Sequence, residues 1–159
     1  MKMNTRRSHL DLRAMRGIPL LLSLLLSVPV MAQSGTATLT IQVTGARNSK
    51  GRIALALFQS AAGFPGDSSK AIRTEQAEID AQTRSAQFVL EGIPYGVYAV
   101  SIFHDENMNG KLDKNLVGAP KEGYGASKNP RKRMGPPPFD EAKFSVSQPE
   151  QSIEIKLIY

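Results

Sequence analysis

Strict alternation of apolar and polar side chains in short segments constrains the fold of this chain most. Between Thr36 and Val43 every second residue is aliphatic, and Ser152–Tyr159 has the same pattern. Successive side chains of a β-strand point to opposite faces, so this pattern predicts strands with one buried face. Five further strands are predicted at Arg52–Gln59, Glu75–Ile79 (a strand or a helical turn), Ala86–Leu90, Tyr98–Ile102 and Ala142–Val146.

The segments between these strands are rich in turn-forming residues. Asn48–Gly51 and residues 91–96 contain the Asn, Gly and Pro that favour tight turns. Because helical periodicity is almost absent, we expect an all-β fold, an antiparallel β-sandwich of about seven strands of the immunoglobulin-like kind. Residues 104–141, which carry five prolines and five glycines, are expected to form one long irregular loop.

The first 32 residues are predicted to be a secretory signal peptide. Basic residues precede an apolar run from Ile18 to Val30, and the small-residue site Val30-Met31-Ala32 follows. The run contains two prolines and is shorter than the roughly 20 residues that span a bilayer. We therefore expect residues 33–159 to form a single domain in the periplasm or the medium, without a transmembrane span. Met15 is an alternative start.

The net charge of the expected mature chain is small. Residues 1–32 hold five of the 20 Lys and Arg residues and one of the 14 Asp and Glu residues. What remains is 15 basic and 13 acidic residues, a net charge of +2. Nucleic-acid binding is therefore not expected. Cysteine is absent from the whole sequence, which excludes disulfides and thiolate chemistry.

The run from Asp105 to Asp113 is the one place where residue spacing indicates a specific chemistry. Its side chains match the calcium-loop pattern D-x-[DN]-x-[DN]-G, with oxygen-bearing residues at positions 1, 3, 5 and 9 and glycine at position 6. The predicted ligands are the side chains of Asp105, Asn107, Asn109 and Asp113 and the carbonyl of Lys111. Position 12 is Leu116, which cannot act as the bidentate carboxylate, although Asn115 or Glu122 could replace it. We expect weak binding, with a dissociation constant of about 10⁻⁴–10⁻³ M.

The same run has a simpler interpretation. Asn109-Gly110 is a strong hairpin-turn sequence, and Asp and Asn side chains stabilise turns without an ion. Both interpretations stay open at this point.

Catalysis is not expected from this sequence. It lacks the G-x-S-x-G motif, and His104 is the only histidine after residue 32. His104 beside Asp105 or Glu122 could act as a general base in a periplasmic enzyme. A single histidine at a strand end is more often packed or hydrogen-bonded, so this is the least favoured function.

A basic cluster follows the candidate loop. It comprises Lys128, Arg131, Lys132 and Arg133. Such a cluster could bind anionic lipid or a polyanion, which would make the chain a cell-envelope interaction protein. The alternative is a solvated, charged loop.

Two longer motifs carry a resemblance to a known family. They are H-D-E-N-x-N-G-K-L-D at residues 104–113 and G-x-P-x-E-G-Y-G-x-S at residues 118–127, preceded by F-x-L-x-G-I-P-x-G-x-Y-A-V at residues 88–100. The pattern resembles an exported bacterial family catalogued as domain of unknown function 2141, over residues 37–158. That family has no established activity. Its Gly-rich turn is also similar to that of transthyretin-like and carboxypeptidase-regulatory-like β-sandwiches. The resemblance therefore implies an accessory or binding module with an unknown protein or envelope partner.

Overall fold

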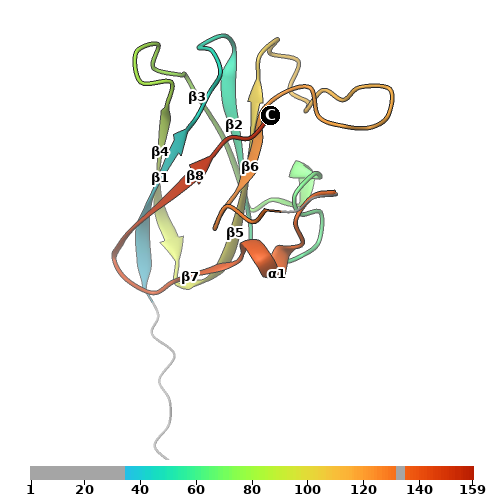
Figure 1. The fold of residues 1–159 in the computed structure, drawn as a ribbon. Helices are drawn as coiled ribbons and strands as arrows, with labels where there is room; N and C mark the ends of the chain where they lie inside the picture. Colours follow the sequence, from blue (N-terminus) through green and yellow to red (C-terminus); the bar gives the residue numbers. More distant parts are fainter. Residues whose placement is uncertain (1–34, 132–134) are drawn as a thin grey trace, which may run out of the picture. The chain divides into compact units, whose positions relative to one another are not determined.

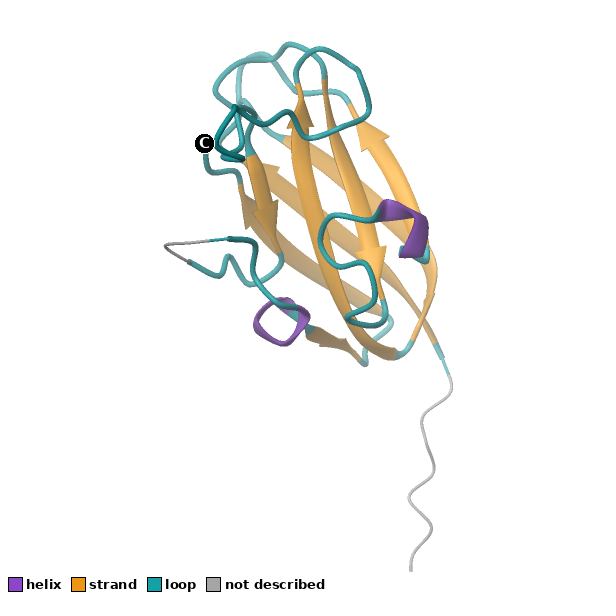
Figure 2. Ribbon diagram, turned by 90° about the vertical axis from the view of Figure 1, so that its right-hand side faces the viewer, coloured by secondary structure: helices purple, strands orange, loops and turns teal. Residues whose placement is uncertain are grey.

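The computed structural model describes residues 35–131 and 135–159, and these residues are nearly all β (Figure 1). The predicted signal peptide lies outside the described residues. The strands are β1 (Thr36–Thr44), β2 (Arg52–Phe58), β3 (Arg73–Ala77), β4 (Ala86–Pro94), β5 (Gly96–Asp105), β6 (Tyr124–Ala126), β7 (Phe144–Val146) and β8 (Glu150–Lys156). Two short helices, the 3₁₀-helix η1 (Ser68–Lys70) and α1 (Phe139–Ala142), lie outside the strands (Figure 2). None of the helices in the described part of the chain is long and apolar enough to cross a membrane.

The strands form two sheets. The three-stranded sheet has the order β4-β1-β8, and the five-stranded sheet has the order β3-β2-β5-β6, with β7 also paired to β5. Every pair is antiparallel except β1 with β8, in which Ile41 lies opposite Ile153 in a parallel register. The all-β class is thus confirmed, and the expectation of a purely antiparallel arrangement is wrong for this pair. Alternation shows which face of a strand is buried but not the direction of its neighbour.

One hydrophobic core receives side chains from both sheets. The alternating residues of β1 that were predicted to face inward are at most 2% exposed: Ala37, Leu39, Ile41 and Val43. Ile53, Leu55 and Leu57 of β2 belong to the same buried cluster. Burial of such side chains contributes about 1.5–3 kcal/mol each, so these two strands are strongly fixed in register.

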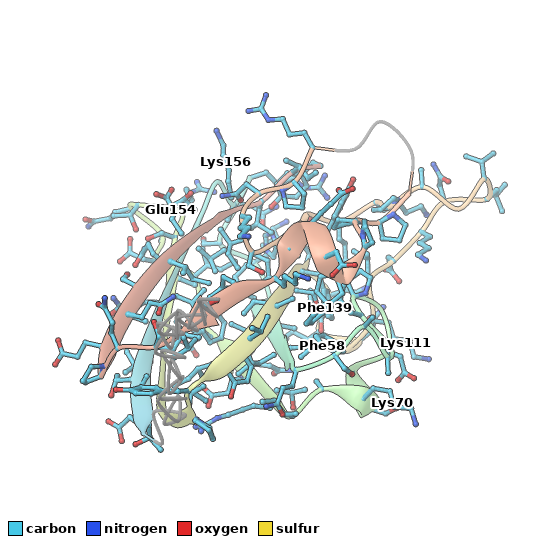
Figure 3. All side chains as sticks on the ribbon, turned by 90° about the horizontal axis from the view of Figure 1, so that it is seen from below. Phe58, Lys70, Lys111, Phe139, Glu154 and Lys156 are labelled. Atoms are coloured by element: carbon cyan, nitrogen blue, oxygen red, sulfur yellow. The ribbon has the colours of Figure 1, made fainter. Side chains whose placement is uncertain are left out.

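The second face of β2 is also covered. Phe58 is fully buried and packs edge-to-face on Phe64, with ring centroids 5.4 Å apart. Phe64 packs in the same way on Phe139 of α1, at 5.8 Å. Phe58 and Phe139 are labelled close to each other in Figure 3. This small cluster explains why β2 is apolar on both faces near its end.

The segment predicted as one long loop contains regular structure. β5 continues through Asp105, β6 pairs with β5 through Ile102 opposite Gly125, and α1 forms near the end of the segment. β6 has only three residues, Tyr-Gly-Ala, which are too few to show alternation. Ala142, predicted to start a strand, instead ends α1, and β7 begins at Phe144.

Candidate functional site

The candidate loop begins where β5 ends. Asp105 is the last residue of β5 and lies opposite Arg52, the first residue of β2. Gly51 precedes β2 with φ of +66°, and a Cβ atom at this position would lie 1.9 Å from the carbonyl oxygen of Asp105. The turn before β2 therefore packs directly against the first residue of the candidate loop, which only glycine permits.

The carboxylate of Asp105 folds the loop back on itself. Its Oδ1 accepts a hydrogen bond from the backbone N–H of Asn109 at 3.0 Å, and its Oδ2 accepts one from Gly110 at 2.8 Å. Gly110 has φ of +75°, as the sharp turn at position 6 requires. Asp105 is only 3% exposed, so its two hydrogen bonds replace contacts with water.

Three of the predicted ligand side chains meet at one point. Asn107 Nδ2 donates to Asp113 Oδ2 at 2.8 Å, and Asn109 Nδ2 donates to Asp113 Oδ1 at 3.0 Å. The amide oxygens of the same two residues accept backbone N–H groups, from Asn109 and Lys111 respectively. The structure thus brings together positions 3, 5 and 9 of the run, with Asp105 at its base.

The buried carboxylate of Glu122 binds the backbone of the loop at two points. The residue is 4% exposed, and its two oxygens accept hydrogen bonds of 2.9 Å from the backbone N–H groups of Glu106 and Asp113. The sequence suggested Glu122 only as a replacement ligand. Its carboxylate instead bonds to backbone groups near the start and at the end of the run. The spacing of residues in the sequence does not show this contact.

The loop contains oxygen atoms of the kind that a hard cation prefers, but the amides of Asn107 and Asn109 turn Nδ2 rather than Oδ1 toward Asp113. Carboxylate, amide and carbonyl oxygens are the ligands that Ca²⁺ prefers, and the carbonyl of Lys111 accepts no hydrogen bond from any described residue. Within residues 35–131 and 135–159 no Lys or Arg forms an ion pair with Asp105 or Asp113. The same residues contain no group of three or more His, Cys, Asp or Glu side chains placed to hold a metal ion. The loop thus has two carboxylates whose partners are N–H groups rather than cations.

His104 is a buried structural residue in this geometry. It is 0% exposed, and its Nε2 lies 2.7 Å from the carbonyl oxygen of Lys50, which can only accept. Nε2 therefore carries the proton. Nδ1 lies 2.7 Å from the hydroxyl of Tyr159, which itself accepts the backbone N–H of Arg47 at 3.0 Å. In the neutral ring Nδ1 is then the acceptor and the Tyr159 hydroxyl is the donor, so both ring nitrogens of His104 are engaged.

Charged groups surround this tyrosine. The Arg47 guanidinium lies 4.7 Å from the centre of the Tyr159 ring and also pairs with Glu106. Burial raises the pKa of Tyr159 above its usual value of 10.0. For Glu106 burial acts to raise the pKa, but hydrogen bonds from Asn48 and Arg47 outweigh it and lower the pKa below 4.5.

The sequence analysis missed Tyr159 as the partner of His104, and Arg47 as the partner of Tyr159. The nearest indication was the aromatic residue at the end of the last predicted strand, whose position gives no information about its contact. A Cβ atom at Gly123 would lie 2.5 Å from Cζ of the Tyr159 ring. The Tyr159 ring therefore packs directly against Gly123 of the second family-like motif, where any side chain would clash with it.

The basic cluster is only partly described. Lys128 and Arg131 are exposed, whereas Lys132 and Arg133 lie outside the described residues. Lys128 has φ of +64°. The neighbouring residue, Asn129, binds the backbone of β8.

A comparison with protein families bears on these motifs. The model of a family described as "Uncharacterized protein conserved in bacteria", domain of unknown function 2141, matches residues 41–154. The chain belongs to this family. The resemblance predicted from the 104–113 and 118–127 motifs is confirmed. Neither the curated proteins nor the solved structures gave a match.

The part of this chain that matches the model of domain of unknown function 2141 contains the whole candidate loop and Glu122. It also contains His104 and Arg47, but it ends before Tyr159. The hydroxyl that supports His104 thus comes from a residue beyond the matched region.

Proposed function

We propose that this protein is an exported accessory or binding module, a β-sandwich of the transthyretin-like or immunoglobulin-like kind, whose 105–113 loop is completed by a weakly bound calcium ion. The observation that supports this most is the convergence of Asn107, Asn109 and Asp113 side chains above the buried Asp105. A plain hairpin turn does not require three such side chains to meet beside a buried carboxylate.

The ion would be held by the residues that the sequence predicted. These are the side chains of Asp105, Asn107, Asn109 and Asp113 and the carbonyl of Lys111. Bound calcium would supply positive charge that no described Lys or Arg supplies to Asp105 or Asp113. Because Glu122 already binds both ends of the run, the backbone is arranged before the ion arrives. Binding would mainly require the amides of Asn107 and Asn109 to turn their oxygens toward the ion, since Nδ2 of each now donates to Asp113.

The test is thermal unfolding of the chelator-treated protein with and without millimolar calcium. A dissociation constant of about 10⁻⁴–10⁻³ M predicts a stabilisation of about 0.5–1.5 kcal/mol. For a domain of this size the melting temperature should rise by a few degrees. Magnesium should cause a smaller rise, because it requires near-ideal octahedral geometry and loses water reluctantly.

Asp113→Ala is the informative variant, because Asp113 is partly exposed and its loss removes one carboxylate without removing the base of the loop. It should abolish the calcium response. Asp80→Ala is the matched control, since the Asp80 carboxylate also accepts backbone N–H groups in a turn, from Gln82 and Thr83, and should leave the response intact. An unchanged response in Asp113→Ala, or no response in a folded wild-type protein, would leave the run as an Asx-rich turn.

A further inference from the structure

The two most exposed large apolar side chains of the described residues are neighbours at the tip of one loop. Leu116 is 107% exposed and Val117 is 86% exposed. In Figure 1 this loop is the orange segment that projects beyond the strands. Exposed apolar side chains are ordinary when scattered, but a contiguous group on a projecting turn indicates a contact surface.

The tip is held in this form by its own hydrogen bonds. Asn115 Oδ1 accepts the N–H groups of Val117 at 3.1 Å and Ala119 at 2.9 Å. The Asn115 N–H donates to the Ala119 carbonyl at 2.8 Å, and Gly118 donates back to Asn115 at 3.0 Å with φ of +82°. Lys114 and Pro120 form an isolated bridge below the turn. Leu116 and Val117 are therefore displayed by an ordered turn, so little conformational entropy is lost when they bind.

The charge around the tip has a single sign on its outer side. Lys111, Lys114 and Lys121 are exposed, and segment 114–121 contains no Asp or Glu. In the described part of the chain these lysines form no ion pair. The neighbouring carboxylates are already hydrogen-bonded within the loop: Asp113 accepts side-chain amides, and the buried Glu122 accepts backbone N–H groups.

We propose that this tip docks on an anionic lipid bilayer, with Leu116 and Val117 entering the headgroup–acyl boundary and the three lysines contacting lipid phosphates. A bilayer accepts a projecting apolar turn without a matching groove. Its surface also supplies the negative charge that the outer side of this loop lacks. Long lysine side chains beside apolar residues are suited to this boundary, because their stems can lie in the apolar layer while the charge stays at the phosphates. This surface is separate from the 128–133 cluster and does not depend on calcium.

The test is flotation of the purified protein with vesicles of phosphatidylcholine, with and without phosphatidylglycerol. We expect binding to the anionic vesicles that weakens as salt is added. Leu116→Ser/Val117→Ser should lower the partition coefficient at least about tenfold, since two apolar side chains no longer enter the bilayer. Lys114→Gln/Lys121→Gln should lower it about fivefold for each charge removed, on anionic vesicles only. Ile72→Ser/Val89→Ser, a matched pair of half-exposed residues elsewhere, should change nothing.

A spectroscopic test separates insertion from simple adsorption. The sequence contains no tryptophan, so Leu116→Trp introduces a single reporter at the tip. Its emission should shift to the blue on anionic vesicles, whereas that of Val89→Trp should not. The proposal is overturned if neither vesicle binds. It is equally overturned if binding survives the Leu116/Val117 change but is lost when Arg131, Lys132 and Arg133 are replaced by Gln, because the cluster would then be the contact.

Discussion

A single hydroxyl group connects three parts of the chain at the buried end of β5. The Tyr159 hydroxyl accepts the Arg47 N–H and donates to His104, which is fully buried. Tyr159→Phe would leave both groups without this partner, and we expect a loss of about 1–3 kcal/mol in the free energy of unfolding. Urea unfolding measures this. Tyr95→Phe is the control, since the Tyr95 hydroxyl bonds to no described residue and its loss should cost little.

The same tyrosine predicts a dependence of stability on alkaline pH. Burial raises the pKa of Tyr159, and likewise that of Tyr98, above 10.0. Above pH 10.0 the unfolded chain releases these protons while the folded protein still holds them, so the free energy of unfolding falls as pH rises; below pH 10.0 the contribution is constant. We expect the urea midpoint of wild type to fall more steeply above pH 10.0 than that of Tyr159→Phe. Equal slopes would show that Tyr159 does not contribute.

The contacts of single residues could be predicted from the sequence only where the partners are close together in the chain. Asp105, Asn107, Asn109 and Asp113 lie within nine positions, and their convergence follows from the turn at Gly110. Glu122 and Tyr159 reach their partners through the fold of the whole chain. The pairing of His104 with a residue 55 positions away depends on how β8 returns beside β6, which no local pattern encodes.

At the scale of elements, a side chain takes the place of a missing strand beside β8. β8 is an edge strand, and Asn129 binds it as a neighbouring strand would: Oδ1 accepts the Lys156 N–H at 2.7 Å and Nδ2 donates to the Glu154 carbonyl at 3.1 Å. Figure 3 shows Glu154 and Lys156 along this strand. Covering an edge in this way also protects against pairing with other chains.

Asn129→Ala should expose this edge. We expect the amide of Lys156 to exchange with solvent about fivefold faster, which corresponds to the loss of about 1 kcal/mol for one hydrogen bond. Asn129→Asp retains the oxygen that accepts from Lys156 and should preserve slow exchange. Hydrogen exchange followed by NMR measures both variants. Equally fast exchange in the two variants would mean that the N–H is protected by something other than this oxygen.

The predictability of the strands followed their burial. β1 and β2 were predicted almost to the residue because one face of each lies in the core. β3 was ambiguous between a strand and a helical turn, and none of its residues is buried, so packing left no clear pattern in its sequence. β6 was missed because its three residues are defined by pairing with distant segments, β5 on one side and Ile158 on the other.

At the scale of the whole molecule, the last three residues join the two sheets. The Leu157 N–H donates to the carbonyl of Thr44 on β1, and Ile158 pairs with Tyr124 on β6. Leu157 itself is 3% exposed within the core. One short segment therefore bonds to a strand of each sheet, in addition to the contact of Tyr159 with His104.

A chain that ends at Lys156 should be much less stable than the full chain. Loss of the buried Leu157 side chain alone costs about 2–5 kcal/mol, and the melting temperature should fall by roughly 10 °C or more. Ile158→Ala is the control, because Ile158 is 45% exposed and its backbone bonds to Tyr124 persist. A similar melting temperature for the shortened and full chains, measured by circular dichroism, would contradict this role.

The parallel pairing of β1 with β8 has a consequence for when the protein can fold. Thr44 of β1 bonds to Glu154 of β8, 110 residues further along the chain. A contact between residues so far apart in the sequence forms late and slowly, because the long loop between them must close first. Until residues 150–156 have been synthesised, β1 lacks its neighbour on one side, so the three-stranded sheet cannot be completed. Residues 36–44 must therefore wait, with one row of backbone N–H and C=O groups unpaired, for a strand made much later.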